Sequence, residues 1–245
     1  MKLLLALLVP AAFLAPNVTG TALPATVRTL ENDSTPHLRA DLRAFVDARR
    51  SEFDTIPEER RAELASFGAL VRQALDADGT ADLTFVCTHN SRRSHLAQVW
   101  AQTAALHLGI EGITAYSGGT EATACNPRTV AAMKRAGFEV TQTTQADNPI
   151  YHVRYAERVP AVTCFSKVYD APPNPSRDFY AVMTCTSADE ACPIVPGASA
   201  RVSLPYEDPK AFDGTAREAE AYDERCRQIA REMLYALTEA KADAR

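Results

Sequence analysis

The sequence predicts an α/β fold built on a parallel β-sheet. Between residues 82 and 240, short apolar runs alternate with longer helical patterns. Strands that alternate with helices in this way form parallel sheets with right-handed crossovers. The chain has 245 residues, of which 46% are hydrophobic, so it can bury a sizeable core. Its net charge of −5 argues against a general nucleic-acid-binding protein.

The N-terminus has the pattern of an export signal. Lys2 gives a positive start, and residues 3–14 are nearly all apolar, which is the length of a signal-peptide core and too short to span a bilayer. We predict a signal peptide over residues 1–22 and a polar linker over 23–36. The alternatives are a misassigned start and a short apolar tail. A real signal places the mature chain outside the cytoplasm, in the periplasm, and otherwise the chain is cytoplasmic. No later segment is long and apolar enough to cross a membrane.

Residues 37–80 form a predicted helical extension. Apolar residues recur at helical spacing in two stretches, Leu38, Leu42, Phe45 and Val46, and then Leu64, Phe67, Leu70, Val71 and Leu75. Thr55 with Glu58, and Pro57 between them, predict the start of the second helix. We expect a helical hairpin that packs on the main domain, and its sequence indicates no chemistry.

The main domain is predicted over residues 81–245. A strand, a loop and a helix occupy residues 83–109, and a strand at 113–116 precedes a helix that Asn126 and Pro127 open and Gly137 closes. Residues 150–168 suggest an inserted hairpin, and residues 170–177 a proline-rich loop. Further buried strands are expected at 179–184 and 200–204, before a final helix at 215–240 with Cys226 in its apolar stripe.

The strongest chemical signal is a C-x5-R loop at the end of the first strand. Cys87 and Arg93 flank a turn whose backbone N–H groups, together with the helix N-terminus, favour a bound oxyanion and an ionised thiol. Arg93 can bind two oxyanion oxygens, and the hydroxyl of Ser94 can donate to the thiolate. Because the pattern joins an apolar strand to a helix, we interpret it as an anion loop rather than as chance. The predicted oxyanion-binding residues are Thr88, His89, Asn90, Ser91, Arg92, Arg93 and Ser94.

A second pair of cysteines follows the third strand. Strand ends that share a sheet edge lie close together, so Cys185 is expected to approach Cys87. If residues 185–192 were helical, the two ends would lie about 10 Å apart, and a bond between Cys185 and Cys192 would require unwinding. The alternative is an inert pair. A metal site is not predicted, because the C-x6-C spacing is wide and no histidine is near. Cys125 and Cys164 are interpreted as packing residues.

An acidic residue just past the fourth strand can protonate a leaving oxygen. Asp208 precedes Pro209, which holds it extended, and Glu207 is the competing candidate. An ordinary loop acid is the alternative interpretation of both carboxylates.

These motifs, taken together and in this order, resemble the low-molecular-weight tyrosine phosphatase superfamily over residues 82–240. The resemblance is carried by the 87–94 loop, Ser117-Gly-Gly-Thr-Glu-Ala, Asn126-Pro127, Cys185-x6-Cys192-Pro193 and Glu207-Asp208-Pro209. The paired downstream cysteines resemble its thioredoxin-coupled arsenate reductase branch. The resemblance implies a flavodoxin-like, phosphatase I-like core: a doubly wound four-stranded parallel sheet.

The resemblance also implies a mechanism. Cys87 attacks arsenate held by Arg93, and Asp208 protonates the departing oxygen. Cys185 then attacks Cys87, and Cys192 attacks Cys185, leaving a disulfide for an external thioredoxin to reduce. No bound cofactor or metal is implied. In a phosphatase, the alternative, water would hydrolyse a cysteinyl-phosphate formed from phosphotyrosine or another phosphate ester, and the downstream cysteines would be spectators.

Three residues depart from the pattern of this family. His89 stands where a small residue is usual, Arg92 replaces a residue that is often cysteine, and Gln98 replaces a glutamate linked to potassium binding. The insertion near Tyr151 and Tyr155 lies where phosphatases shape substrate choice, and it could either form an aromatic wall or pack. A non-catalytic oxyanion-binding module is a third hypothesis, which is disfavoured because every catalytic residue is present. An oxidising compartment would also lack ordinary thioredoxin, which conflicts with the reductase interpretation.

Overall fold

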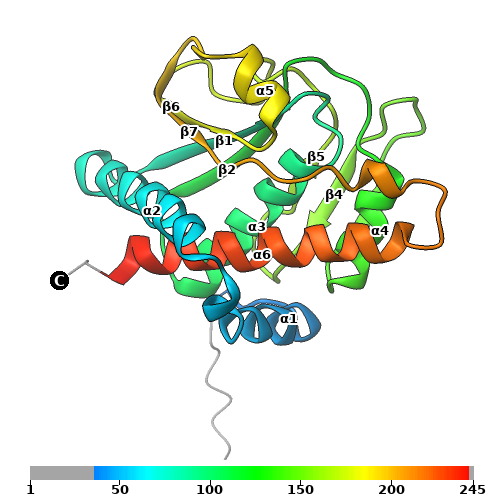
Figure 1. The fold of residues 1–245 in the computed structure, drawn as a ribbon, viewed down its shortest axis with the longest axis horizontal. Coiled ribbons are helices and arrows are strands. Elements are labelled where there is room, and N and C mark those ends of the chain that lie inside the picture. Colours follow the sequence, from blue (N-terminus) through cyan, green and yellow to red (C-terminus); the bar gives the residue numbers. More distant parts are fainter. Residues whose placement is uncertain (1–35, 243–245) are drawn as a thin grey trace, which may run out of the picture. The chain divides into compact units, whose positions relative to one another are not determined.

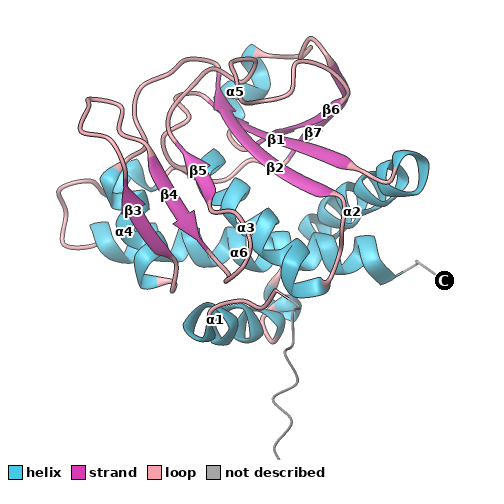
Figure 2. Cartoon of the chain, turned by 180° about the vertical axis from the view of Figure 1, so that it is seen from behind, coloured by secondary structure: helices cyan, strands magenta, loops and turns pink. Residues whose placement is uncertain are grey.

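A four-stranded, fully parallel sheet forms the centre of the computed structural model, which describes residues 36–242. Its strand order is β2-β1-β6-β7 (Figure 2). This is the order of a flavodoxin-like fold, in which the second strand lies outside the first. The strands span Ile113–Gly119 (β2), Ala81–Cys87 (β1), Phe179–Met183 (β6) and Ala198–Ser203 (β7).

The two central strands are apolar because both of their faces are covered. Every residue of β1 except Asp82 is buried, as expected of a strand in a parallel sheet. The register pairs Cys87 with Gly119 and Val86 with Met183, so the ends of three strands meet at one edge. The predicted parallel sheet is therefore confirmed, and β2 extends through the glycines that the sequence analysis placed after it.

The two faces of this sheet are covered unequally. One face is covered by α2 (Glu58–Asp78), α3 (Arg93–Leu108) and α6 (Glu218–Ala242). Phe85 of β1 belongs to the same buried core as these helices. Figure 1 shows α6 running along this side beneath the strands. The other face, which includes Val86, is covered by the short helix α5 (Thr186–Ala191) and by the segment around Tyr169.

A second, antiparallel sheet of order β3-β4-β5 lies beside the first (Figure 2). It contains the predicted hairpin, formed by β4 (Tyr151–Arg154) and β5 (Val162–Cys164). The strand β3 (Glu139–Gln142) was not predicted, because three of its four side chains are exposed and it lacks an apolar alternation. Helix α4 (Pro127–Arg135) leads into it. Asn126 caps its N-terminus, as predicted, with a side chain that accepts from the N–H of Arg128.

The predicted helical extension consists of α1 (Ala40–Arg50), the short 3-10 helix η1 (Phe53–Thr55) and α2. It packs on the sheet and on α3: Phe67 meets Phe85 edge to face, and Phe45 stacks on Trp100. The described residues, 36–242, accordingly belong to one compact unit. Thr55 does not cap α2, contrary to the predicted helix start, because its hydroxyl donates back to the carbonyl of Glu52 within η1.

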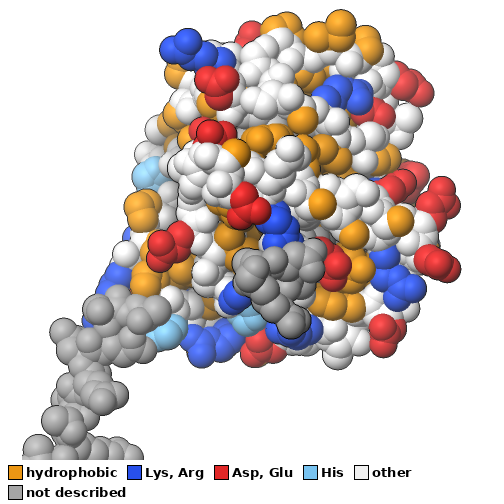
Figure 3. Space-filling view, turned by 90° about the vertical axis from the view of Figure 1, so that its left-hand side faces the viewer, with side chains coloured by type: hydrophobic (Ala, Val, Ile, Leu, Met, Phe, Trp, Pro, Cys, Tyr) orange, Lys and Arg blue, Asp and Glu red, His pale blue; other side chains and the backbone are white. Residues whose placement is uncertain are grey.

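The final helix α6 presents the predicted apolar stripe to the core. The fully or nearly fully buried side chains are Tyr222, Cys226, Ile229, Met233 and Leu237. Within residues 36–242 no helix is long and apolar enough to cross a membrane. The predicted signal peptide, and the linker up to residue 35, lie outside the described residues. Basic and acidic side chains are interspersed over the face shown in Figure 3.

Candidate active site

The C-x5-R loop turns from β1 into α3 and places the Cys87 thiol beside a serine. Cys87 Sγ lies 3.1 Å from Ser94 Oγ, and both side chains are buried. Asn90 adopts a left-handed conformation, with φ of 44°, and its Nδ2 donates to Ser94 Oγ at 2.9 Å. Because Ser94 Oγ accepts from Asn90, the hydrogen of the Ser94 hydroxyl is free to point toward Cys87 Sγ.

The segment after β2 braces the loop from one side. The N–H groups of Thr120 and Glu121 donate to the carbonyls of Cys87 and Thr88. Gly119 is required for this approach, because a Cβ there would lie 2.7 Å from both Asn90 N and Thr88 O. The motif Ser117-Gly-Gly-Thr therefore supports the loop by main-chain contact.

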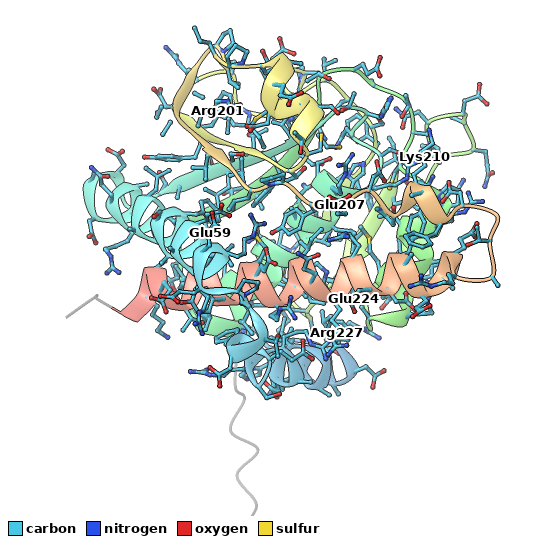
Figure 4. All side chains as sticks on the ribbon, in the orientation of Figure 1. Glu59, Arg201, Glu207, Lys210, Glu224 and Arg227 are labelled. Atoms are coloured by element: carbon cyan, nitrogen blue, oxygen red, sulfur yellow. The ribbon has the colours of Figure 1, made fainter. Side chains whose placement is uncertain are left out.

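Asp208 lies against the guanidinium of Arg93, as the sequence analysis anticipated for an acid at the loop. Arg93 Nη2 donates to Asp208 Oδ2 at 2.7 Å, and Arg93 Nη1 donates to the carbonyl of Tyr206 at 3.0 Å. Asp208 also accepts from the N–H of Lys210, which fixes the carboxylate at the start of the 3-10 helix η2 (Pro209–Phe212). Figure 4 shows Glu207 and Lys210 on this segment above α6. Arg93 Nε is buried without a hydrogen-bond partner, so it remains a donor for an oxyanion.

Two predicted loop residues direct their side chains away from the thiol. Arg92 is buried and donates from Nε to Tyr222 of α6, while its Nη1 lies 3.7 Å from Asp208. His89 Nε2 lies 2.8 Å from Glu121, and the His89 carbonyl accepts from Thr123. The side chains of both residues are therefore engaged by protein groups other than Cys87.

Cys185 lies at the loop, as the sheet topology predicts. Its sulfur is 3.4 Å from Thr88 Oγ1, and it packs in the same buried cluster as Cys87. Cys192 is half-buried and packs against that cluster from the other end of α5. The segment between the two cysteines is helical, and Arg201 of β7 holds its end by donating to the carbonyl of Cys192 and to Asp189. Figure 4 shows Arg201 beside α5, far from α6.

All six cysteines are free thiols, and three of them are separate from this cluster. Burial raises the pKa of Cys164 and of Cys226 to about 12, and raises that of Cys125 well above its usual value. Cys226 accepts from the indole N–H of Trp100, which supports its predicted packing role. Burial lowers the pKa of the nearby Lys167 to about 8, and its ammonium lies over the ring of Phe165.

Gln98 and Ser117 form a buried polar pair next to the loop. Gln98 Oε1 accepts from the Ser117 hydroxyl at 2.7 Å, and its Nε2 donates to the carbonyl of Ala115. Ser117 also contacts His95 Nδ1, whose pKa burial lowers to about 3. The amide of Gln98 is thus engaged by protein groups. Within residues 36–242, no cluster of three acidic, histidine or cysteine side chains could hold a metal.

The inserted sheet presents no aromatic wall. Tyr151 and Tyr155 are both buried in the main core, so the packing alternative is the one the structure supports. A pocket of about 940 Å³ lies between Asp208, Phe212, α4 and α6, but no residue of the 87–94 loop lines it. It is therefore distinct from the oxyanion loop. Tyr206 and Lys167 contact the site through residues distant in the sequence, which no local pattern encodes.

The fold and the site define a class of protein: a thiol-dependent enzyme that binds a tetrahedral oxyanion at the edge of a parallel sheet. Cys87 and Arg93 lie in one loop between a strand and a helix, and Asp208 contacts that loop through Arg93. This is an arrangement of groups suited to covalent chemistry on an oxyanion. Residues 82–153 match the family model described as low molecular weight phosphotyrosine protein phosphatase.

The chain belongs to the low-molecular-weight phosphotyrosine protein phosphatase family, which its sequence relatives also indicate. It is 31% identical over 143 residues to an arsenate reductase of Bacillus licheniformis, an alignment covering 58% of this chain and 84% of the relative. It is 30% identical over 127 residues to an arsenate reductase of Staphylococcus epidermidis, covering 51% and 76%. The enzyme is accordingly a thiol-dependent reductase or a cysteine-based phosphatase.

Solved structures with low sequence identity were also found. One is a low-molecular-weight protein tyrosine phosphatase from T. tengcongensis, with a TM-score of 0.44 and 15% identity, covering 65% of this chain and 99% of that one. Another is an arsenate reductase from Archaeoglobus fulgidus, with a TM-score of 0.36 and 18% identity, covering 60% and 98%.

Proposed function

We propose that this enzyme is an arsenate reductase that uses Cys87 as its nucleophile and passes the oxidation to Cys185 and then to Cys192. The observation that carries the proposal is the packing of all three cysteines in one cluster on one face of the sheet. Within it, Cys185 touches Thr88, the residue next to the nucleophile. The names of the relatives at 30–31% identity support the same activity.

The first step forms a sulfur–arsenic bond. The Cys87 thiolate, stabilised by Ser94, attacks arsenate whose oxygens are held by the loop N–H groups and by Arg93. Asp208 donates a proton to the departing oxygen, which leaves as water. The bond between Arg93 and Asp208 means that the group which binds the oxyanion also positions the acid.

The second step reduces arsenic. Cys185, as a thiolate, attacks the sulfur of Cys87, and the electron pair of the sulfur–arsenic bond goes to arsenic, which leaves as arsenite. Cys192 then attacks Cys185, releases Cys87 as a thiolate and forms the Cys185–Cys192 disulfide. An external dithiol of the thioredoxin class supplies two electrons and two protons to restore both thiols. The two electrons that convert arsenic(V) to arsenic(III) are thereby balanced.

The last exchange requires α5 to change shape. Cys185 caps the N-terminus of α5 and Cys192 its C-terminus, so about 10 Å of helix separates them. A disulfide needs Cα atoms within about 7 Å. Because α5 has only six residues, unwinding it breaks few hydrogen bonds, and the contacts of Arg201 with Asp189 are the main additional restraint.

The decisive experiment follows NADPH oxidation by purified, pre-reduced protein with arsenate, thioredoxin and thioredoxin reductase. We expect arsenate-dependent oxidation in the wild type, none in Cys87→Ser or Cys185→Ser, and at most one turnover per chain in Cys192→Ala. Cys164→Ala is the matched control, since this buried cysteine lies outside the cluster, and it should retain turnover. Multiple turnover by Cys192→Ala would overturn the relay.

The second candidate function is phosphotyrosine phosphatase activity, favoured by the family match over residues 82–153. It uses the same Cys87, Arg93 and Asp208, but water resolves the covalent intermediate. Release of phenolate from an aryl phosphate in the same preparation tests it. Aryl phosphate turnover that survives Cys185→Ser, with no arsenate-dependent NADPH loss, would establish the phosphatase instead.

The compartment determines which reductant serves the relay. We propose that residues 1–22 act as an export signal, which requires a dithiol reductant outside the cytoplasm. Fractionation of cells that express the full chain tests this. Recovery of the protein in the cytoplasm, with an unprocessed N-terminus, would contradict export.

A further inference from the structure

A residue of the N-terminal extension reaches the segment that carries the acid. Arg60 of α2 donates from Nη2 to the carbonyl of Pro205, and its guanidinium lies 4.9 Å from the ring centre of Tyr206. Its Nε donates to Glu232 of α6 at 2.8 Å. A single side chain therefore joins α2, α6 and the segment immediately before Asp208.

Tyr206 connects this contact to the reactive groups. Its N–H donates to the carbonyl of Thr184, the residue before Cys185, and its carbonyl accepts from Arg93 Nη1. Arg93 in turn binds Asp208. Each link in this chain of contacts is a hydrogen bond or a ring contact between adjacent groups, so a shift of Tyr206 moves an acceptor of Arg93 directly.

Burial makes the contact of Arg60 costly to lose. Tyr206 and Glu232 are 4% and 1% exposed, and Glu232 is also bonded by Gln228. Burial by itself lowers the pKa of Arg60, but Tyr206 and Glu232 raise it overall, so the guanidinium is charged. Glu232 is buried, and Arg60 forms an ion pair with it at 2.8 Å, so loss of Arg60 would leave this carboxyl group without its ion-pair partner in the core.

We propose that Arg60 is a positioning residue, which holds the 205–208 segment so that Arg93 and Asp208 keep their reactive geometry. The inference rests on the proposed function in that Arg93 and Asp208 act on the substrate. It assigns the helical extension a part in turnover. The role is the same for arsenate and for an aryl phosphate, because both substrates use these two residues.

The expected effect is smaller than loss of the acid itself. General acid catalysis contributes about 10²- to 10⁴-fold, and a misplaced acid loses part of this. We expect kcat to fall about tenfold in Arg60→Met. Because this variant leaves Glu232 unpaired, the double variant Arg60→Met/Glu232→Gln removes both charges and tests the same contact in a folded protein.

The experiment measures kcat with arsenate and, in parallel, with an aryl phosphate. The variants are Arg60→Met/Glu232→Gln, Asp208→Asn and the combination of all three changes. Arg227→Met is the matched control, since Arg227 also joins α6 to the extension, through Glu52. Figure 4 shows Arg227 on the side of α6 near α1. The control should leave kcat within twofold of the wild type.

Non-additivity distinguishes positioning from general weakening. If Arg60 acts through the acid, its loss costs about tenfold in the wild type and less than twofold when Asp208 is already asparagine. Two outcomes would overturn the inference and leave the proposed function intact. One is an equal loss of kcat from the Arg60 change in both backgrounds. The other is a normal kcat in Arg60→Met/Glu232→Gln although Asp208→Asn alone lowers kcat. Absence of arsenate turnover in the wild type, with aryl phosphate turnover present, would overturn the proposed function alone.

Discussion

Asn90 should be among the residues of the loop least tolerant of substitution. Its side chain is completely buried and spans the loop: Nδ2 donates to Ser94, and Oδ1 accepts from the N–H of Lys167. Its backbone is left-handed, with φ of 44°, a conformation that asparagine tolerates and alanine does not. Asn90→Ala therefore removes two hydrogen bonds and imposes strain at the same position.

The size of the loss follows from these contacts. The N–H of Lys167 is left buried and unpaired, which costs about 1–3 kcal/mol, and the lost donor to Ser94 costs about 0.5–1.5 kcal/mol. The left-handed backbone adds about 1–2 kcal/mol for alanine. We expect the free energy of unfolding to fall by about 2.5–6.5 kcal/mol, which is a large share of the stability of a typical domain.

Urea unfolding, followed by the fluorescence of the sole and buried Trp100, measures this loss. Asn90→Gly is the matched control: it removes the same hydrogen bonds but accepts a positive φ, so it should be more stable than the alanine variant. The alkylation rate of Cys87 by iodoacetamide should fall in both, since Ser94 is no longer oriented. A loss below about 1 kcal/mol in Asn90→Ala would refute the reasoning.

Three further predictions concern other parts of the structure. His95 has a pKa of about 3 in the folded protein, so its ring is neutral there. In the unfolded chain its pKa returns to the ordinary value of 6.5, so below pH 6.5 the unfolded chain binds a proton that the folded protein does not. Stability that is present above pH 6.5 is therefore lost as the pH falls from 6.5 toward 3. This proton linkage lowers the free energy of unfolding by about 2 kcal/mol between pH 7 and pH 5. His95→Gln should abolish this loss in urea titrations, and an unchanged pH dependence would contradict the buried neutral histidine. Asp189→Asn weakens the ion pair with Arg201 at α5, so rapid-quench trapping should show the second disulfide forming several-fold faster, whereas slower formation would mean that α5 need not unwind. Phe67→Ala should cost about 3–5 kcal/mol in calorimetry, since its buried ring packs on Phe85; a loss under 1 kcal/mol would mean that the extension is not part of the core.

The sheet could be predicted because its signals are local. The central strands β1 and β6 are short apolar runs, and α3 ends at a recognisable residue, Gly109, which is left-handed. The edge strand β7 has no buried side chain, contrary to the buried strand predicted there. The strand β3 could not be predicted in this way, since only Val140 of its four residues is even partly buried. It forms because β4 supplies hydrogen-bond partners, which is a tertiary effect that a single segment does not encode.

In the candidate site too, local features could be predicted from the sequence, whereas contacts between distant residues could not. Cys87 and Arg93 lie within one contiguous motif, so their shared loop could be predicted from spacing and flanking pattern. The contact of Arg60 with the 205–208 segment spans 145 residues of sequence, and nothing near Arg60 distinguishes it from other arginines of α2. Arg92 illustrates a further limit: its position in the loop suggested a bound anion, but its side chain turns to Tyr222 on α6.

The three cysteines outside the cluster have a consequence for the fidelity of electron transfer. With a pKa of about 12, Cys164 and Cys226 are ionised at neutral pH in roughly one molecule in 10⁵, and thiols exchange only when ionised. Cys125 is protected in the same way. In the proposed relay, an oxidising equivalent that enters at Cys87 thus has no competing acceptor among these three, so six thiols are compatible with transfer confined to Cys87, Cys185 and Cys192.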